Sequence, residues 1–333
     1  LGFFGPGSWV AAAITLTVSL VAFGTAEDFV AAFLPELANT EDIGWISSIG
    51  WAAGYVGGLF SLGACLAYVY WARSVHMTEP QYVPVIMLAC AVFYALLAIP
   101  TFVFLKERAK PDPSLRMNEV VRVGFERLAV TVGHAKHYRD LFNFLFCLFI
   151  YACGTTTIVH VASIYAQQVL AFTTTDSLIM ILVVDITAAI GAVVFGMIQR
   201  KIGSTKTLSI SLGIWMVAIL VAYSATTKMH LWIAANFVGV AMGATGSTGR
   251  ALVAQFSPRG RSGEFLGLWG MAVKLATGVG ALVFGLVTYL TASNYRLALL
   301  STLVFFIGGW LLLLRVNETR GIEAAHTDVE LEV

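Results

Sequence analysis

Two ionisable side chains, Asp185 and Lys274, lie well inside long apolar stretches of the sequence. A charged group in hydrocarbon is costly unless it is paired or hydrated, so each is a candidate for function. A carboxylate and an ammonium that face one cavity can bind the two ends of a zwitterion. They can also pair with each other until a substrate or a proton separates them. The alternatives are a permanent structural ion pair, and a Lys274 side chain that extends along its stem toward the membrane surface.

A second set of polar residues lies in the apolar stretch 141–168 and includes Tyr151, Thr155 and His160. We expect their helix to face a central cavity. His160 is a candidate carrier of a coupling proton, because histidine is the side chain most often used for proton transfer near neutral pH. The alternative is structural, because threonine hydroxyls in membrane helices often bond back to the preceding turn and His160 can pack against the bundle.

These residues are embedded in long apolar stretches that dominate the chain. The stretches cover 9–28, 44–72, 83–105, 141–168, 178–199, 207–225, 231–254, 263–290 and 297–316. Each is close to or above the ~20 residues with which a helix crosses a bilayer. Hydrophobic residues make up 58% of the sequence, charged residues 12%, and the mean hydropathy is +0.82. The sequence therefore predicts an all-α membrane protein with nine transmembrane helices.

Basic residues between the apolar stretches fall almost entirely on alternate connections. One set of connections, with the tail, carries Lys106, Arg108, Lys110, Arg116, Arg122, Arg127, Lys136, Arg139, Arg200, Lys201, Lys206, Arg259, Arg261, Arg315 and Arg320. The other set carries Arg73, Lys228 and Arg296. The positive-inside rule places the first set in the cytoplasm. The C-terminus is then cytoplasmic, and the Leu1 end lies outside.

The longest polar stretch, 106–140, divides the apolar stretches into three before it and six after it. We expect four regions: 1–105, a remnant of an amino-terminal half; 106–140, a cytoplasmic linker; 141–316, a six-helix half; and 317–333, a cytoplasmic tail. The linker is expected to hold an amphipathic helix on the membrane surface, because apolar residues recur in it at helical spacing. These residues are Leu115, Val121, Phe125, Leu128 and Val132.

An internal repeat is visible at two of the cytoplasmic turns. Pro35, Gly44 and Gly57 recur at the same spacings as Pro258, Gly267 and Gly280. Parallel duplication of a six-helix half, a known plan of secondary transporters, would produce this pattern. The first three stretches then correspond to the last three, and three of an expected twelve helices are absent before Leu1.

Glu27 and Arg250 occupy equivalent places in this repeat. Each lies eight residues before its proline, Pro35 or Pro258, which is ~12 Å from the cytoplasmic turn along a helix. We expect them to form a gate that closes the cytoplasmic side of the cavity. The alternative is that interface water or a neighbouring helix satisfies each separately. Asp28 is expected only to face the membrane interface.

Small residues within the apolar stretches predict close helix packing rather than chemistry. The glycines assigned to such contacts are Gly44, Gly54, Gly57, Gly267 and Gly280. The segment GATGSTG (243–249) looks like a phosphate loop, but it lies in an apolar stretch and lacks the Lys-Ser/Thr ending. The four cysteines have no metal-ligand spacing, so neither a metal nor a cofactor is predicted. The sequence has no basic patch interleaved with aromatic residues, so nucleic-acid binding is not predicted.

Several segments resemble the major facilitator superfamily, in particular the branch that includes the fungal vacuolar amino-acid effluxer linked to autophagy. They are FLPELA (33–38), GWISSIGWAAGYVGG (44–58), YACGTTT (151–157), ASIYAQQVL (162–170), GRALVAQFSP (249–258) and GEFLGLWGMAVKLATGVGALVFG (263–285). GMIQRKIGSTK (196–206) is similar to the loop motif of the superfamily, with Gly196, Arg200, Lys201, Gly203 and Lys206 at its positions.

The resemblance implies family helices four to twelve, with the helices of Asp185 and Lys274 lining the central cavity. The sequence departs from the family at three places. Arg200 stands where the loop motif has an acid, Cys153 where the family has Asp, and Ala31 where it has Asn. The last two changes remove polar groups near the expected cavity.

The residues and the resemblance together predict a major facilitator-type secondary transporter that works by alternating access. Its expected partners are the lipid bilayer, a small solute such as an amino acid, and a coupling proton. The expected location is the bacterial cytoplasmic membrane, or the vacuolar membrane if the source is eukaryotic. One alternative is a truncated, non-transporting remnant or interaction protein, and residues 1–333 alone are expected to be inactive. A membrane-embedded enzyme or a channel is disfavoured, because neither a clustered catalytic set nor a regular polar stripe is present.

The orientation is testable with single cysteines introduced at positions 79, 120 and 228. A membrane-impermeant thiol reagent added outside is expected to label positions 79 and 228, whereas position 120 stays protected until the membrane is permeabilised. The basic residues that flank position 120 are the reason for this expectation. Labelling in the reverse pattern would overturn the orientation.

Overall fold

The computed structural model describes residues 7–39, 41–106, 122–124, 126, 138–258 and 261–331, and these residues contain helices but no strand. Before the linker come α1 (Trp9–Ala32), α2 (Leu34–Leu37), α3 (Ile43–Ser74) and α4 (Glu79–Phe104). After it come α6 (Arg139–Leu170), α7 (Thr174–Ile202), α8 (Ser204–Tyr223), α9 (Lys228–Gln255), α10 (Ser262–Leu290), α11 (Tyr295–Ser301), α12 (Leu303–Leu313) and α13 (Glu318–Leu331). The all-α prediction is confirmed.

Eight helical segments of the described chain are long and apolar enough to cross a membrane. The predicted span 231–254 is not among them, although α9 covers it with 28 residues. Its second half is rich in glycine, alanine, serine and threonine, which lowers its hydropathy. α9 packs against α3, α7 and α8, so it needs little lipid-facing apolar surface. The count of nine spans stays a prediction.

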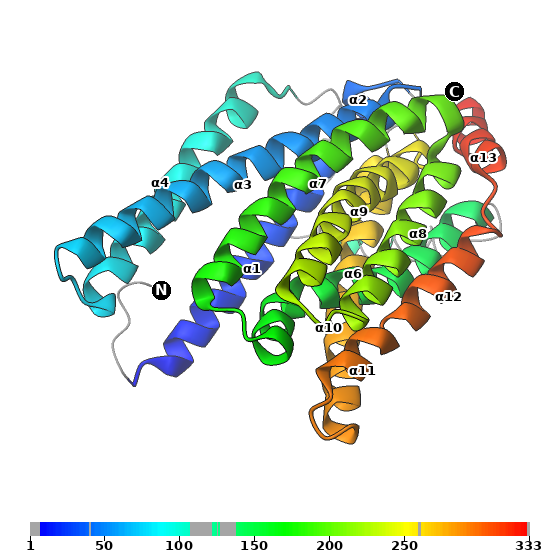
Figure 1. Cartoon of the computed structure of the whole chain (residues 1–333). Helices are drawn as coiled ribbons and strands as arrows, with labels where there is room; N and C mark the ends of the chain where they lie inside the picture. The colour runs from blue at the N-terminus through cyan, green and yellow to red at the C-terminus, as the bar shows by residue number, and fades with distance from the viewer. Residues whose placement is uncertain are drawn as a thin grey trace.

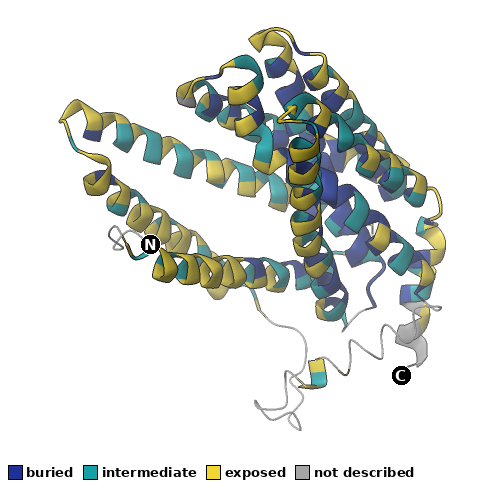
Figure 2. Cartoon of the chain, turned by 90° about the horizontal axis from the view of Figure 1, so that it is seen from below, coloured by how far each residue is buried: buried dark blue, intermediate teal, exposed yellow. Residues whose placement is uncertain are grey.

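The helices after the linker form a bundle with a large apolar core. Trp215 of α8 stacks on Phe306 of α12 with ring centroids 5.3 Å apart, and Phe144 of α6 meets Phe256 edge-on at 6.4 Å. All four rings are buried. Among the eight apolar spans α6 is the most buried, with 56% of its apolar segment buried. Figure 2 shows the buried residues concentrated in this part of the molecule.

The helices before the linker attach to this bundle at one side. α1 packs along α10, α3 packs against α7 and α9, and α4 packs mainly on α3 (Figure 1). In each of the spans that contain α1, α3 and α4, only 6% of the 18-residue apolar segment is buried. The far ends of α3 and α4 extend away from the bundle, and most of their residues there are exposed (Figures 1 and 2).

The predicted amphipathic helix in 106–140 falls largely outside the described residues, including Leu115, Val121, Phe125, Leu128 and Val132. Residues 122–124 and 126 are helical, and Arg122 forms an ion pair with Glu126 one turn later at 2.7 Å. The boundaries of the four predicted regions likewise remain predictions.

The predicted tail contains a helix, α13, that docks on the bundle (Figure 1). Glu318 accepts hydrogen bonds from the backbone N–H groups of Ser204 and Thr205, both at 2.9 Å, and so caps the start of α8. Arg320 donates two hydrogen bonds to Asp140 at the start of α6, at 2.5 and 2.7 Å. This contact raises the pKa of the Arg320 guanidinium. The tail is therefore a structured brace across the ends of α6 and α8.

The contacts between the two groups of helices follow the offset of the predicted repeat to within one residue. The distance in sequence from Pro35 to Pro258 also relates Trp51 to Lys274 and Ser47 to Gly270.

Lys274 of α10 lies against Gly24 of α1, and Trp51 of α3 lies against Gly246 of α9. In the same way Asp28 of α1 contacts Gly270, and Arg250 of α9 bonds to Ser47. The α1–α10 and α3–α9 interfaces are thus built alike, and superposition of the two hairpins stays a prediction.

The five predicted packing glycines differ in their surroundings. Gly280 faces the Cys153 carbonyl and the Thr157 hydroxyl so closely that no side chain fits, and Gly44 lies against the Gln199 amide. Gly57 has only Leu97, at 3.9 Å from an ideal Cβ position. Gly54 and Gly267 have no neighbour within 4 Å of that position. The prediction of close packing is therefore wrong for Gly54 and Gly267, because spacing alone does not say which helix face meets a partner.

Gly280→Ala is expected to destabilise the protein by about 1–3 kcal/mol, because the added methyl group would overlap the α6 backbone. Gly267→Ala is the matched control on the same helix and is expected to have little effect. The measurement is the unfolding free energy of the detergent-purified protein. Equal stability of the two variants would contradict the close contact between α10 and α6.

Candidate functional site

An ion pair joins the two groups of helices near the middle of α10. Lys274 Nζ lies 2.6 Å from Asp28 Oδ2 of α1 and 3.4 Å from the Gly24 carbonyl oxygen. Gly24 makes this approach possible, because a Cβ there would lie only 2.6 Å from Lys274 Cε. The Lys274 side chain is 48% exposed and that of Asp28 is 22% exposed. The pair is therefore partly accessible.

This pairing corrects two predictions from the sequence. One of the two expected arrangements was an ion pair between Lys274 and Asp185. Lys274 instead pairs with Asp28. Asp28 was expected only to face the membrane interface. It instead forms an ion pair with Lys274, which lies deep within an apolar helix. Depth along a helix can be counted from sequence, but the direction of a side chain around the helix cannot be counted in this way.

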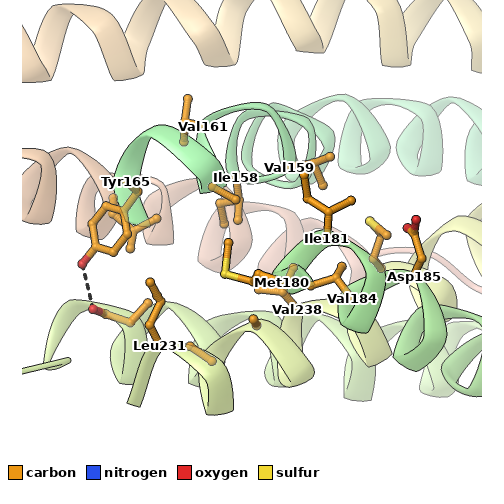
Figure 3. Close-up of a pocket in the computed structure, with 16 residues that line it drawn as sticks. Ile158, Val159, Val161, Tyr165, Met180, Ile181, Val184, Asp185, Leu231 and Val238 are labelled. Atoms are coloured by element: carbon orange, nitrogen blue, oxygen red, sulfur yellow. Dashed lines mark hydrogen bonds between the residues drawn. The ribbon is translucent and has the colours of Figure 1, made fainter. Parts of the chain in front are cut away.

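Asp185 lies at the rim of a different cavity, of about 260 Å³, between α6, α7 and α9 (Figure 3). The walls are apolar and include Ile158, Met180 and Val238. At the opposite end from Asp185, Tyr165 donates a hydrogen bond to the Ala222 carbonyl at 2.7 Å (Figure 3). Among the described residues Asp185 forms no ion pair. The expected polar cavity is thus an apolar one with a carboxylate at its edge.

Arg250 anchors α9 to α3. Its Nε donates to Ser47 Oγ at 3.1 Å, and its Nη2 donates to the Ser47 carbonyl at 2.9 Å. Ser47 Oγ in turn donates to the Ser247 carbonyl at 2.9 Å. The guanidinium also lies over the Trp51 ring, 5.6 Å from its centroid, in a cation–π contact. Both of its hydrogen-bond partners are neutral.

Glu27 and Arg250, the predicted cytoplasmic gate, interact electrostatically with each other. In the described chain they form no direct ion pair, and Glu27 also interacts with Asp28 and Lys274. The structure therefore brings the gate residues and the Lys274–Asp28 pair into one charge cluster, which we call the interface cluster. Its members are Glu27, Asp28, Arg250 and Lys274. The gating role itself remains a prediction.

Two residues that sequence reasoning missed lie beside this cluster on α3. Trp51 Nε1 and Tyr55 Oη are buried and have no hydrogen-bond partner in the described part of the protein. Their rings are 5.7 Å apart, one helical turn from each other, and Tyr55 interacts electrostatically with Asp185, Arg250 and Glu27. The available signal was the pair of polar aromatic residues four apart in an apolar stretch.

The predicted polar residues of α6 are mostly satisfied within their own helix. Thr155 Oγ1 donates to the Ala152 carbonyl at 3.4 Å, and His160 Nδ1 lies 2.6 Å from the Thr156 carbonyl. Tyr151 is buried, with its hydroxyl against Gly249 and without a hydrogen-bond partner among the described residues. The structural alternative accounts for the bonds of Thr155 and His160, and a role in transport remains a prediction for all three.

The loop-motif residues lie at the end of α7, in the turn at Gly203 and at the start of α8. Arg200, which stands at the acid position of the motif, forms an ion pair at 3.2 Å with Asp42 of the α2–α3 turn. Gly196 packs against Ser48 of α3, and Gly203 has a φ of +88°, which favours glycine. Lys201 and Lys206 are exposed. The motif thus contacts the other group of helices through a basic residue. In the described chain, no three His, Cys, Asp or Glu side chains are grouped to hold a metal ion.

Comparison with known proteins gives concordant matches. The family described as "Vacuole effluxer Atg22 like" matches residues 41–326. The "Uncharacterized MFS-type transporter YxiO" of Bacillus subtilis is 24% identical over 99% of this chain and 77% of its own length. "Autophagy-related protein 22" of Yarrowia lipolytica is 24% identical, over 72% of this chain and 45% of its own. The chain thus spans less than half of that fungal relative.

Solved structures of major facilitator transporters share the fold. The human organic anion transporter MFSD10 has a TM-score of 0.64 and 18% identity, covering 86% of this chain and 67% of its own. The transporter FucP in its outward conformation has a TM-score of 0.65 and 15% identity, covering 87% of this chain and 72% of its own. The predicted major facilitator-type bundle and multi-pass membrane protein are confirmed, and the relatives are transporters rather than enzymes.

The pairing of Lys274 is testable by double-mutant cycles. Asp28→Asn or Lys274→Gln alone leaves one unpaired charge, whereas the double change removes both charges. Unfolding free energies from SDS titration are expected to be non-additive for this pair by about 0.5–3 kcal/mol. The matched control combines Asp185→Asn with Lys274→Gln, for which additivity is expected. Coupling at 185 and additivity at 28 would reverse the assignment.

Proposed function

The chain belongs to the family of Atg22-like vacuole effluxers within the major facilitator superfamily, and from that premise we propose that it moves a small zwitterionic solute by alternating access. An amino acid is the best candidate for that solute. The single observation that carries the proposal is the interface cluster, in which two acids and two bases lie where α1 and α3 meet α9 and α10.

The position of the cluster suits alternating access. Such transport requires one group of helices to rock against the other around a shared site. The Lys274–Asp28 pair spans that boundary, because its partners come from α10 and α1. A pair that bridges the boundary holds one arrangement and must be broken or rearranged for the other. A substrate charge or a proton on Asp28 would supply that change.

The mixture of charges supports a zwitterion. A solute with one positive and one negative group can interact with an acid and a base of the cluster without leaving an unpaired charge in the membrane. A coupling proton has candidate sites in Glu27 and Asp28, which interact electrostatically with each other. The relatives in bacteria and fungi are consistent with a cytoplasmic or a vacuolar membrane.

Transport is testable by measuring the flux of a panel of labelled L-amino acids in vesicles that contain the protein as cells make it. Saturable flux of at least one panel member is expected. Lys274→Ala is expected to abolish it, because Asp28 would lose its partner and the cluster would lose a positive charge. The protein should still reach the membrane in normal amount.

Lys228→Ala is the matched control, since Lys228 forms an ion pair with Asp176 at 2.8 Å within the bundle, away from the boundary. It is expected to retain flux. Wild-type flux in Lys274→Ala would reject the role of the cluster. Lack of flux for the whole panel would favour the alternative of a protein that does not transport amino acids.

A further inference from the structure

Arg250 has hydrogen-bonding capacity that the protein does not use. A guanidinium carries five N–H donors, and the two bonds to Ser47 leave three of them without a partner among the described residues. Its neighbours in hydrogen bonding are neutral, and Glu27 forms no direct ion pair with it in the described chain. Arg250 is therefore the cation of the interface cluster that has no bonded counter-ion, whereas Lys274 is paired with Asp28.

Two further donors lie next to this guanidinium. Trp51 Nε1 is a donor only, and Tyr55 Oη can donate, and both are buried without a partner in the part of the chain that the structure describes. A buried donor without an acceptor is energetically unfavourable. The Trp51 ring lies under Arg250, and Tyr55 lies close enough to Arg250 to interact with it electrostatically. Three donor groups therefore lie close together, and their free N–H and O–H groups have no acceptor among the described residues.

Glycines hold this arrangement in place. A Cβ at Gly50 would lie 3.2 Å from Arg250 Nη2, and a Cβ at Gly246 would lie 3.1 Å from the Trp51 ring. A side chain at either position would crowd the guanidinium or the indole ring, which would then have to shift. The two glycines therefore leave the room in which Arg250 and Trp51 lie together between α3 and α9.

We propose that Arg250, Trp51 and Tyr55 form the subsite that binds a carboxylate group of the solute. This inference rests on the proposed function and names the residues that recognise the negative end of the solute. A carboxylate accepts several hydrogen bonds, and a guanidinium binds it through two parallel N–H groups. The indole N–H and the phenol O–H supply the remaining donors.

The surrounding charge selects a singly charged anion. Asp185 and Glu27 both interact electrostatically with Tyr55, and Glu27 also interacts with Arg250, so a group with two negative charges, such as phosphate, would meet stronger repulsion there. A carboxylate next to a positive group on the same solute would meet less repulsion. Lys274 is the less suitable receptor for the anion, because Asp28 already neutralises it.

The test is ligand binding to the detergent-purified protein as cells make it, by equilibrium dialysis. Three matched sets are compared: L-amino acids, their carboxamides, and the corresponding carboxylic acids without the amino group. Wild-type protein is expected to bind the acid of a matched pair about tenfold or more tightly than its carboxamide, because the amide brings one acceptor and no charge. Arg250→Gln is expected to abolish that preference.

Tyr55→Phe keeps the ring and removes only the hydroxyl, so it tests the subsite even if Arg250→Gln fails to fold. It is expected to weaken binding of the acid several-fold and to leave the amide unchanged. Lys228→Gln, at an ion pair away from the boundary, is expected to keep the preference for acid over amide. Equal binding of acids and amides by the wild type, no binding of any of them, or an intact preference in both Arg250→Gln and Tyr55→Phe would overturn the proposal.

The outcomes separate this proposal from the proposed function. Amino-acid flux without any acid-over-amide preference would reject the subsite and leave the transporter standing. Tight binding of the carboxylic acids without the amino group, lost in Arg250→Gln, would support the subsite and reject the zwitterion as the substrate class.

Discussion

The cost of placing charge in hydrocarbon governs the centre of this protein. Four charged side chains lie within the apolar helices where α1 and α3 meet α9 and α10. Each of them would be energetically costly to expose to lipid. The structure reduces that cost by collecting acids and bases at one boundary. Lys274 and Asp28 neutralise each other, and Arg250 is held by Ser47 and Trp51. The boundary between the helix groups is therefore also where polar ligands are least costly to bind.

Glycine provides the geometry that this solution needs. Lys274 reaches Asp28 by passing over Gly24, and the Asp28 carboxylate rests on Gly270. On the other interface Arg250 approaches Gly50 and Trp51 approaches Gly246. Small residues let helices come close in a membrane, where exclusion of water does not drive them together. The same positions that allow packing thus allow long polar side chains to cross from one helix group to the other.

The sequence predicted the helices and their order well, because hydropathy and length depend on local composition alone. It did not predict the partner of Lys274, since that depends on how α1 and α10 are rotated about their axes. Asp28 and Asp185 both lie within apolar stretches, and only packing distinguishes the one that faces α10. Gly267 was assigned to a close contact for the same reason. The small residues of 243–249 did predict close packing, and α9, which contains them, packs against α3, α7 and α8.

The predicted repeat would account for the two signs of charge in the cluster. Duplication of a half would give each position a counterpart with similar surroundings. The counterparts differ in chemistry: Glu27 corresponds to Arg250, and Trp51 corresponds to Lys274. In the structure Glu27 interacts electrostatically with Arg250, and the Trp51 ring lies against the Arg250 guanidinium. Identical charges at two corresponding positions would repel each other across the boundary. The acids and bases of the cluster instead attract each other, and a zwitterionic solute can replace these interactions with its own two charges.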